Sequence, residues 1–172
     1  AAFPVQAQNT ARITVDAAKK IGKVNPLIFG HNLEAADSKG IFGPASSSDV
    51  TRTGTGIWNP ETQSPVAFVM QESKNIGVKM LRYPGGCLVH GFDWKKAVGS
   101  ISSQPDFAFG LDEYLKVCRD LDAEPLITVS DYAATPQDAA DLVEYLNAPA
   151  DDKHPWAKKR AAWGHPQPYR VK

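Results

Sequence analysis

Three short apolar runs along the chain predict strands of a buried parallel sheet. They lie at residues 26–34, 78–83 and 125–131, and the first and last of them end on a carboxylate. Strands of a parallel sheet are covered on both faces, so they are apolar throughout rather than alternating. Residues 11–16 alternate instead, which predicts a half-exposed strand.

Apolar residues at helical spacing predict three helices between and after these strands. The first is bounded by a Ser64 cap and Gly77, the second spans about 110–121, and the third is capped by residues 135–138. The expected buried faces are Val66, Val69, Met70 and Ser73 in the first, Leu111, Tyr114, Leu115, Cys118 and Leu121 in the second, and Ala139, Leu142, Val143 and Leu146 in the third.

The remaining stretches complete an alternating order. Residues 35–64, rich in Gly, Ser and Thr, are expected to form a long functional or disordered loop. The stretch after residue 147 is predicted to be a polar connection, and residues 169–172 the start of a further strand. Such alternation predicts α/β architecture with right-handed crossovers: an open doubly wound sheet, or the first part of a (β/α)8 barrel. A whole barrel needs about 250 residues.

Composition argues against several kinds of partner. Nineteen basic and nineteen acidic residues give zero formal net charge, so neither nucleic acid nor an anionic membrane is an expected partner. A small-x-small pattern at 5–7 predicts signal cleavage, and therefore a secreted or periplasmic protein, otherwise a cytoplasmic one. Because no paired-cysteine or glycine-rich phosphate motif is present, we expect no metal and no cofactor.

The largest group of side chains suited to binding or catalysis lies at residues 80–94, M-L-R-Y-P-G-G-C-L-V-H-G-F-D-W. An apolar strand carrying Arg82 stops at Pro-Gly-Gly and continues into a segment with thiol, imidazole, carboxylate and indole groups. Ligands bind at the carboxyl ends of parallel strands, so we expect a functional loop here. An unpaired guanidinium in an apolar strand is costly, so we expect a carboxylate partner for Arg82.

Five segments of the chain resemble sequence motifs of a known protein family. They are F-G-H-N-L-E at 29–34, L-R-Y-P-G-G-C at 81–87, D-W at 93–94 followed by V-G at 98–99, F-G-L-D-E-Y at 109–114, and G-H-P-Q-P-Y-R-V-K at 164–172. In this order they resemble the N-terminal half of glycoside hydrolase family 51 of clan A, best known for α-L-arabinofuranosidases. The resemblance implies a retaining enzyme that releases terminal α-L-arabinofuranosyl residues from plant polysaccharides or oligosaccharides.

The resemblance also implies a division of the chain. Residues 21–172 would be the first half of a (β/α)8 TIM barrel, about three and a half βα units, and residues 1–20 would add a strand to a β-sandwich. In the family, the segment matching 169–172 leads into a strand ending Gly-Asn-Glu with the acid/base glutamate, and the nucleophile follows later. We therefore expect a C-terminal polypeptide of the same enzyme to complete the barrel, as a hetero-oligomer with an interface well above about 2,000 Å².

The spacing of the two strand-end carboxylates agrees with this expectation. Glu34 and Asp131 end the first and third predicted strands, so two spacings of about 4.8 Å put them roughly 10 Å apart. Retaining hydrolysis needs a carboxyl pair about 5–5.5 Å apart. We therefore expect no catalytic pair within this chain.

Roles at the strand ends follow from the resemblance. Glu34 would accept hydrogen bonds from hydroxyls of the terminal sugar, the alternative being a solvated or capping carboxylate. Arg82 would support the nucleophile and keep it ionised, the alternative being a structural ion pair. Cys87 would line the sugar pocket, the alternative being an inert buried thiol. A disulfide between Cys87 and the core-facing Cys118 is not expected.

Further residues would border the same site. Asn32 and His31 would reach substrate hydroxyls, Asp131 and Tyr132 would lie at the edge, and Trp94 would either stack on a sugar or only pack. Packing or rim positions are expected for Trp58, His90, Trp156 and Trp163.

Two departures from the family leave the substrate open. Residues 35–41 lack the usual histidine and arginine, and 100–107 form a short segment without the tryptophan often found there. The alternatives are another clan A glycosidase, such as a β-xylosidase or endo-glucanase, or a non-catalytic carbohydrate-binding α/β module.

Overall fold

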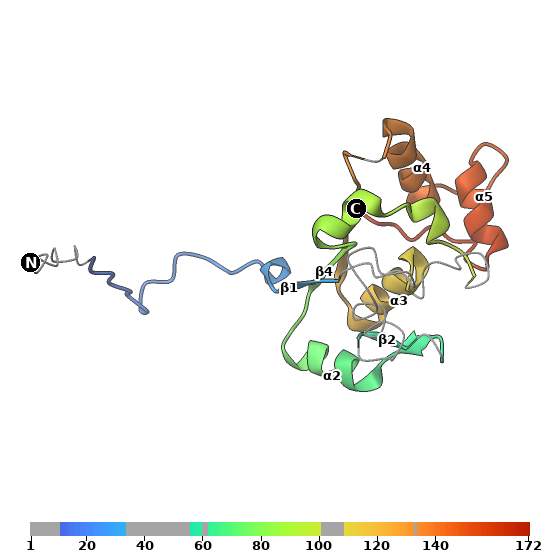
Figure 1. The fold of residues 1–172 in the computed structure, drawn as a ribbon. Helices are drawn as coiled ribbons and strands as arrows, with labels where there is room; N and C mark the ends of the chain where they lie inside the picture. The colour runs from blue at the N-terminus through green and yellow to red at the C-terminus, as the bar shows by residue number, and fades with distance from the viewer. Residues whose placement is uncertain (1–10, 34–55, 60–61, 101–108, 133) are drawn as a thin grey trace, which may run out of the picture.

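The computed structural model describes residues 11–33, 56–59, 62–100, 109–132 and 134–172. Helices and strands alternate along most of this part of the chain (Figure 1). The strands are β1 (Gly30–Asn32), β2 (Trp58–Asn59), β3 (Ser64–Pro65), β4 (Met80–Tyr83) and β5 (Glu124–Ile127). The α-helices are α2 (Ala67–Asn75), α3 (Leu111–Leu121), α4 (Pro136–Asn147) and α5 (Pro155–Ala162). Shorter 3-10 helices are η1 (Pro26–Ile28), η2 (Gly86–Gly91) and η3 (Trp94–Lys96).

Strands β1, β4 and β5 form a parallel sheet in that order. The register pairs Asn32 with Arg82, and Arg82 with Leu126. Strand order therefore follows chain order, and the predicted parallel α/β alternation is confirmed. Strands β2 and β3 form a separate antiparallel pair.

Within the described residues, the central strand β4 has one buried face and one half-buried face at Met80 and Arg82, and the second is the uncovered face. Leu81 and Tyr83 are buried, and the Tyr114 hydroxyl of α3 donates a hydrogen bond to the Leu81 carbonyl oxygen at 2.7 Å. The rings of Tyr83 and Tyr114 stack with centroids 5.0 Å apart. Successive side chains of a strand alternate, so Arg82 points to the face opposite α3.

Helix α3 follows the predicted apolar stripe. Its buried residues include Leu111, Tyr114, Leu115, Cys118 and Leu121. The Glu113 carboxylate accepts a hydrogen bond from the Gly110 N–H at 2.9 Å, which supports the first turn. Cys118 is a free cysteine, as predicted. Burial raises the pKa of its thiol to about 12, so the thiol stays protonated and inert.

Helix α4 begins at the predicted cap. The Asp138 N–H donates to Thr135 Oγ1 at 3.2 Å, and the Asp138 carboxylate accepts from the Thr135 N–H at 2.8 Å. Its buried face differs in part from the prediction, because Tyr145 is buried and Val143 is 59% exposed. The helix therefore packs through positions 142, 145 and 146 rather than through Val143.

Two predicted strands are shorter and more exposed than the sequence pattern indicates. The first begins as η1, where Asn25 Oδ1 accepts from the Leu27 N–H at 3.0 Å, and all three residues of β1 are exposed. In β5, exposed and half-buried residues alternate. Both strands are edges of the sheet as far as the chain is described, so each lacks a neighbour on one side. Only β4 comes near the predicted buried strand, with Leu81 and Tyr83 buried and Met80 and Arg82 half-buried.

The first predicted helix starts later than its apparent cap. Ser64 and Pro65 pair with β2, and the helix begins at Ala67. Pairing in a hairpin competes with helix initiation here, because the Val66 N–H donates to the carbonyl oxygen of residue 57 at 2.9 Å. Most of the predicted loop at 35–64 lies outside the described residues.

Helix α5 lies where the sequence pattern predicts only a polar connection. Pro155 occupies its first turn, and Ala157 and Arg160 are buried. Three consecutive basic residues obscure this apolar face in the sequence. The helix packs against α4 in the upper right of Figure 1.

Neither terminal segment forms its predicted strand. Residues 11–16 are exposed and run away from the sheet (Figure 1), and a strand is not stable without a neighbour to pair with. Near the other end, the Tyr169 N–H donates to the Leu146 carbonyl oxygen at 2.8 Å. Lys172 Nζ lies 3.8 Å from Glu124 Oε1, at the first residue of β5.

Candidate functional site at the carboxyl ends of the strands

Polar side chains gather on the uncovered face of the sheet where the strands end. Asn32 ends β1, and Arg82 lies beside it in the register. Arg82 Nε donates a hydrogen bond to Thr128 Oγ1 at 3.1 Å, just beyond the end of β5. These three side chains form a polar group at the end of the sheet where parallel α/β proteins bind ligands.

Backbone hydrogen bonds join the end of β1 to the turn that follows β4. The Leu33 N–H donates to the Arg82 carbonyl oxygen at 2.8 Å, and the Gly85 N–H donates to the Leu33 carbonyl oxygen at 2.7 Å. A Cβ atom on Gly85 would lie 2.1 Å from Asn32 Nδ2. The Asn32 side chain therefore lies directly over the Pro-Gly-Gly turn, and a side chain at position 85 would require the exposed Asn32 amide to move.

The structure brings together part of the predicted site. Asn32 and Arg82 are adjacent, and Asp131 lies exposed in the turn after β5. Glu34 lies outside the described residues. The backbone of Cys87 belongs to η2, directly after the Pro-Gly-Gly turn, but its side chain is also outside the described part.

The carboxylate partner predicted for Arg82 is not among the described residues. Within them, the hydrogen-bond partner of this side chain is the Thr128 hydroxyl. Arg82 is half-buried within the described part of the chain. This partial exposure lowers the desolvation cost on which the expectation was based.

Trp94 occupies a packing position. Its ring is 6% exposed, and its indole N–H donates to the Asp138 carbonyl oxygen at 3.1 Å. The ring contacts Tyr145 and Trp156, with centroids 5.7 and 4.8 Å away. Protein atoms therefore surround it, in agreement with the packing alternative for this residue.

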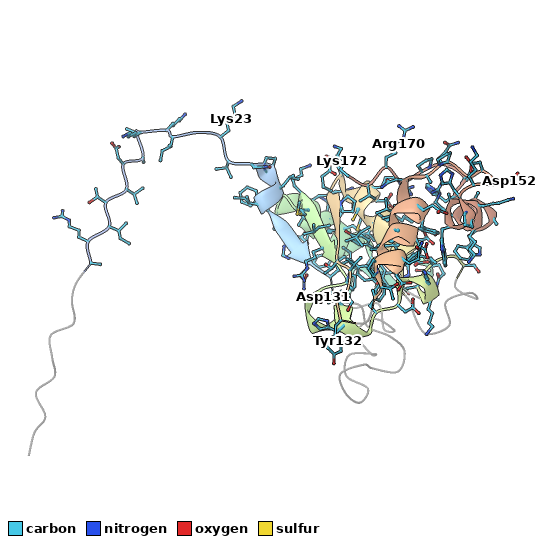
Figure 2. The ribbon with its side chains drawn as sticks, turned by 90° about the horizontal axis from the view of Figure 1, so that it is seen from above. Lys23, Asp131, Tyr132, Asp152, Arg170 and Lys172 are labelled. Atoms are coloured by element: carbon cyan, nitrogen blue, oxygen red, sulfur yellow. The ribbon has the colours of Figure 1, made fainter. Side chains whose placement is uncertain are left out.

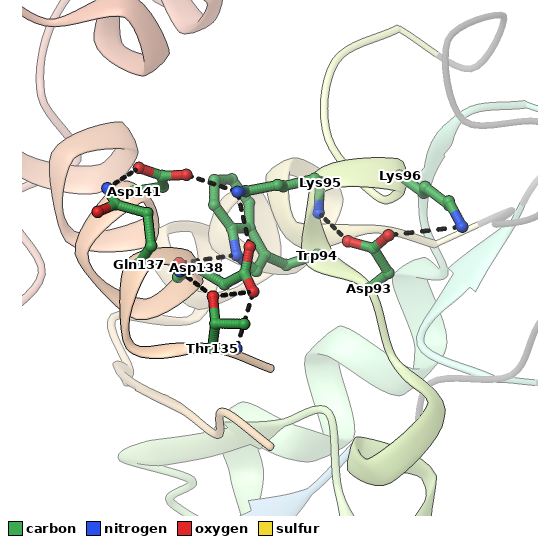
Figure 3. Close-up of polar contacts among 8 residues, drawn as sticks. All are labelled: Asp93, Trp94, Lys95, Lys96, Thr135, Gln137, Asp138 and Asp141. Atoms are coloured by element: carbon green, nitrogen blue, oxygen red, sulfur yellow. Dashed lines mark hydrogen bonds and ion pairs between the residues drawn. The ribbon is translucent and has the colours of Figure 1, made fainter. Parts of the chain in front are cut away.

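An ion cluster joins the loop after β4 to helix α4 (Figure 3). Lys95 Nζ lies 2.7 Å from Asp138 Oδ1 and 2.5 Å from Asp141 Oδ2. Hydrogen bonds from Lys95 lower the pKa of both carboxyls, and the two acceptors raise the pKa of Lys95. The cluster links the loop after β4 to the N-terminal part of helix α4.

This cluster predicts a loss of stability in acid. The folded pKa of each carboxyl lies below its unfolded value of about 3.9, so the contribution is complete above that pH and is lost as the pH falls below it. Lys95→Met should reduce the loss between about pH 5 and about pH 2. Lys96→Met is the control, because Lys96 lies 3.5 Å from an exposed carboxylate on its own turn. Equal urea-midpoint shifts with pH in wild-type and Lys95→Met full-length protein would contradict this prediction.

A second polar cluster was not predicted from the sequence. Asp112 of α3 accepts hydrogen bonds from the Tyr145 hydroxyl at 2.8 Å, the Tyr169 hydroxyl at 2.5 Å and the Gly99 N–H at 2.7 Å. Burial and the Asp112 charge raise the pKa of both tyrosines, which therefore stay protonated as donors. The cluster ties α3, α4 and the C-terminal segment together, and only its position beside the apolar stripe of α3 hints at it in the sequence.

Two further properties concern the described ranges alone. No group of three or more His, Cys, Asp or Glu side chains there is arranged to hold a metal ion. The helices in these ranges are too short or too polar to cross a bilayer.

Comparisons with known proteins match the sequence resemblance. An intracellular exo-α-(1→5)-L-arabinofuranosidase of Streptomyces lividans is 30% identical over 95% of this chain and 25% of its own length. Intracellular exo-α-(1→5)-L-arabinofuranosidase 1 of Bacillus subtilis is 29% identical over 94% of this chain and 33% of its own length. This chain thus spans a quarter to a third of these relatives. Their names describe them as intracellular, which lends no support to export of this chain.

Solved structures show the same fold. A family 51 α-L-arabinofuranosidase from Thermotoga petrophila gives a TM-score of 0.64 at 29% identity, covering 84% of this chain and 30% of that one. A Bifidobacterium longum family 51 enzyme gives a TM-score of 0.72 at 23% identity and covers 90% of this chain. The α-L-arabinofuranosidase 1 domain matches residues 72–172. Because that match spans more than half of the sequence, the chain belongs to the α-L-arabinofuranosidase 1 domain family.

Proposed function

We propose that this chain is the N-terminal part of a retaining α-L-arabinofuranosidase, with both catalytic glutamates in the rest of the enzyme. The observation that carries the proposal is the position of Arg82. It lies on the uncovered face of the central strand, beside Asn32, at the carboxyl end of the sheet. Family membership and the arabinofuranosidases among the relatives supply the reaction.

The proposed substrate is a terminal α-L-arabinofuranosyl residue on a plant polysaccharide or oligosaccharide. The full-length enzyme, assayed against a panel of aryl glycosides, should hydrolyse the α-L-arabinofuranoside with a kcat/KM well above that of each pyranoside. Activity confined to pyranosides, such as a β-xyloside or β-glucoside, would overturn the assignment. Retention of configuration in the first product, observed by NMR, tests the mechanism separately.

The proposed catalytic roles follow from strand order. Glu34 follows β1 and Asp131 follows β5 in the sequence, and β4 lies between these strands. Two strand spacings would put the two carboxylates roughly 10 Å apart, too far for retaining hydrolysis. The nucleophile and the acid/base carboxylate are therefore assigned to the rest of the enzyme. Arg82 is proposed to hydrogen-bond the attacking carboxylate and keep it ionised.

The substrate-binding roles are proposed for the residues around this guanidinium. Glu34 and Asn32 would bind sugar hydroxyls, Cys87 would line the pocket, and Asp131 would border it. Trp94 is buried, so its proposed contribution is to support the loop rather than to stack on a sugar.

Glu34→Ala in the full-length enzyme should lower kcat/KM for the aryl arabinofuranoside by about 30-fold or more. The reason is the loss of a charged acceptor to a substrate hydroxyl, worth roughly 2 kcal/mol. Asp152→Ala is the matched control, because that carboxylate is 91% exposed on the connection to α5. An unchanged kcat/KM for Glu34→Ala would show that the sugar subsite is placed wrongly.

The proposed partner is the remainder of the same enzyme, completing a (β/α)8 barrel. Apolar residues are exposed at both edges of the sheet: Ile28, Phe29, Leu126 and Val129 are 68%, 54%, 46% and 47% exposed. Residues 1–20 are proposed to join a β-sandwich, where a neighbouring strand would pair with 11–16. An edge strand with exposed apolar residues is prone to aggregate unless it is covered.

Expressed alone, the 172-residue, 18.7 kDa chain should therefore aggregate or oligomerise, whereas co-expression with the remainder should give a soluble complex. Gel filtration with light scattering distinguishes these states. A stable, soluble monomer of the chain by itself would contradict the proposed assembly. The expected interface buries well above about 2,000 Å² in total.

A further inference from the structure

Thr128 shares the uncovered face of the sheet with Arg82. The register pairs Arg82 with Leu126 of β5. Alternate residues of an extended chain point to the same face, so Thr128 faces the same way as Leu126, two positions further along. A side chain as long as arginine reaches that position from the neighbouring strand, and Arg82 Nε donates a hydrogen bond to Thr128 Oγ1 at 3.1 Å.

The Thr128 hydroxyl is a fixed acceptor at the carboxyl end of the sheet. The Thr128 N–H donates to the carbonyl oxygen of the buried Tyr83 at 2.9 Å, which continues the pairing of β4 and β5 past the end of β5. A β-branched side chain has few χ1 rotamers, so its hydroxyl stays close to one position. The chain then reaches Asp131, which Figure 2 shows on the opposite side of the protein from Lys172, the residue beside the start of β5.

This hydrogen bond restricts how the guanidinium meets a carboxylate. A guanidinium is planar, with one N–H on Nε and two on each terminal nitrogen, and a carboxylate accepts best from two nitrogens at once. Because the Nε–H of Arg82 is directed at Thr128, the pair of nitrogens that includes Nε is already used. The two terminal nitrogens are the pair left for a carboxylate. A hydroxyl carries no charge, so Thr128 orients the guanidinium without neutralising it.

We propose that Thr128 is a positioning residue for Arg82, and that it fixes the guanidinium plane so that the two terminal nitrogens hydrogen-bond the nucleophile. The inference rests on the proposed function, in which Arg82 keeps that carboxylate ionised. Ordering a long arginine side chain costs conformational entropy, and a hydrogen bond formed in advance lowers the part of that cost that remains when the substrate binds. Thr128 therefore acts on the reaction only through Arg82.

Thr128→Val in the full-length enzyme removes the acceptor and keeps the shape of the side chain. With p-nitrophenyl α-L-arabinofuranoside, kcat/KM near neutral pH should fall by about tenfold, mainly through kcat, because a hydrogen bond to a charged group is lost. The acid limb of the pH profile should move upward, by less than in Arg82→Met, since a poorly oriented guanidinium lowers the pKa of the nucleophile less.

Two further variants serve as comparisons. Thr128→Ser keeps the hydroxyl and should retain most of the wild-type kcat/KM. Thr62→Val is the matched control, because Thr62 is exposed and its hydroxyl lies 2.8 Å from that of Ser64, two residues away. It should leave both kcat/KM and the acid limb unchanged.

A double-mutant cycle tests whether Thr128 acts through Arg82. In the Arg82→Met background, Thr128→Val should change kcat/KM by less than about twofold, because the group that it positions is already absent. A tenfold loss in that background would overturn the inference, as would a Thr128→Ser variant as impaired as Thr128→Val. A lowered melting temperature with an unchanged acid limb would assign Thr128 to the fold alone.

Arg82→Met separates a failure of this inference from a failure of the proposed function. If Arg82→Met lowers kcat/KM and moves the acid limb while Thr128→Val does neither, the inference is wrong and the proposed function stands. If Arg82→Met leaves the acid limb unchanged, or if the wild type hydrolyses no arabinofuranoside, the proposed function is wrong and the inference fails with it.

Discussion

Replacing Arg82 with methionine in the full-length enzyme is expected to lower kcat/KM near neutral pH by about 100-fold or more. Under the proposed function, the guanidinium hydrogen-bonds the attacking carboxylate, and losing one partner of such a charged pair costs roughly 2–5 kcal/mol. The acid limb of the pH profile should also move upward by about 1–3 pH units. The carboxyl that must be ionised loses a cation that holds its pKa down.

This pH shift separates the proposed role from a structural one. If Arg82 served only the fold, Arg82→Met would lower the melting temperature and leave the acid limb unchanged. Arg82→Lys keeps the charge without the planar fork, so it should give an intermediate kcat/KM and a smaller pH shift. Arg119→Met is the control, because Arg119 is 64% exposed on α3.

Replacing Arg160 with methionine should produce the largest loss of stability, about 3–5 kcal/mol. The side chain is fully buried, and it donates to the carbonyl oxygens of residues 145, 148, 165 and 166. Methionine fills a similar volume but leaves these carbonyls without their donor. Arg160→Lys should also be destabilising, since one ammonium does not span the four acceptors.

Urea unfolding of the full-length protein measures this effect. Lys158→Met is the matched control, because Lys158 lies on the same helix with a side chain that is 62% exposed, and it should change stability by less than about 0.5 kcal/mol. A shift for Arg160→Met as small as that of Lys158→Met would show that water replaces the lost hydrogen bonds.

Local sequence patterns were sufficient to predict the elements whose packing or capping partners lie within the described chain. The five-residue apolar stripe of α3 is buried because the sheet that packs against it is present. The Thr135 cap involves only residues 135–138, so it forms without a distant partner. The Pro-Gly-Gly turn likewise marks the end of β4 at Tyr83, because the proline that follows has no N–H to donate to the sheet.

The elements that depend on distant partners were not predictable in the same way. Apolar runs at β1 and β5 indicate buried strands, but both strands are edges in the described chain and remain exposed. Helix α5 was missed because its buried face includes a cationic residue, Arg160, whose charge is satisfied by carbonyls that only the tertiary structure brings together. In the Asp112 cluster, one hydrogen bond joins residues 57 positions apart, and no spacing rule predicts such a contact.

The position of Lys172 has a consequence for the edge strand β5. Its ammonium lies beside Glu124, the first residue of β5, while Tyr169 is anchored to α3 and α4. The segment 169–172 therefore braces the start of this edge strand against the two helices.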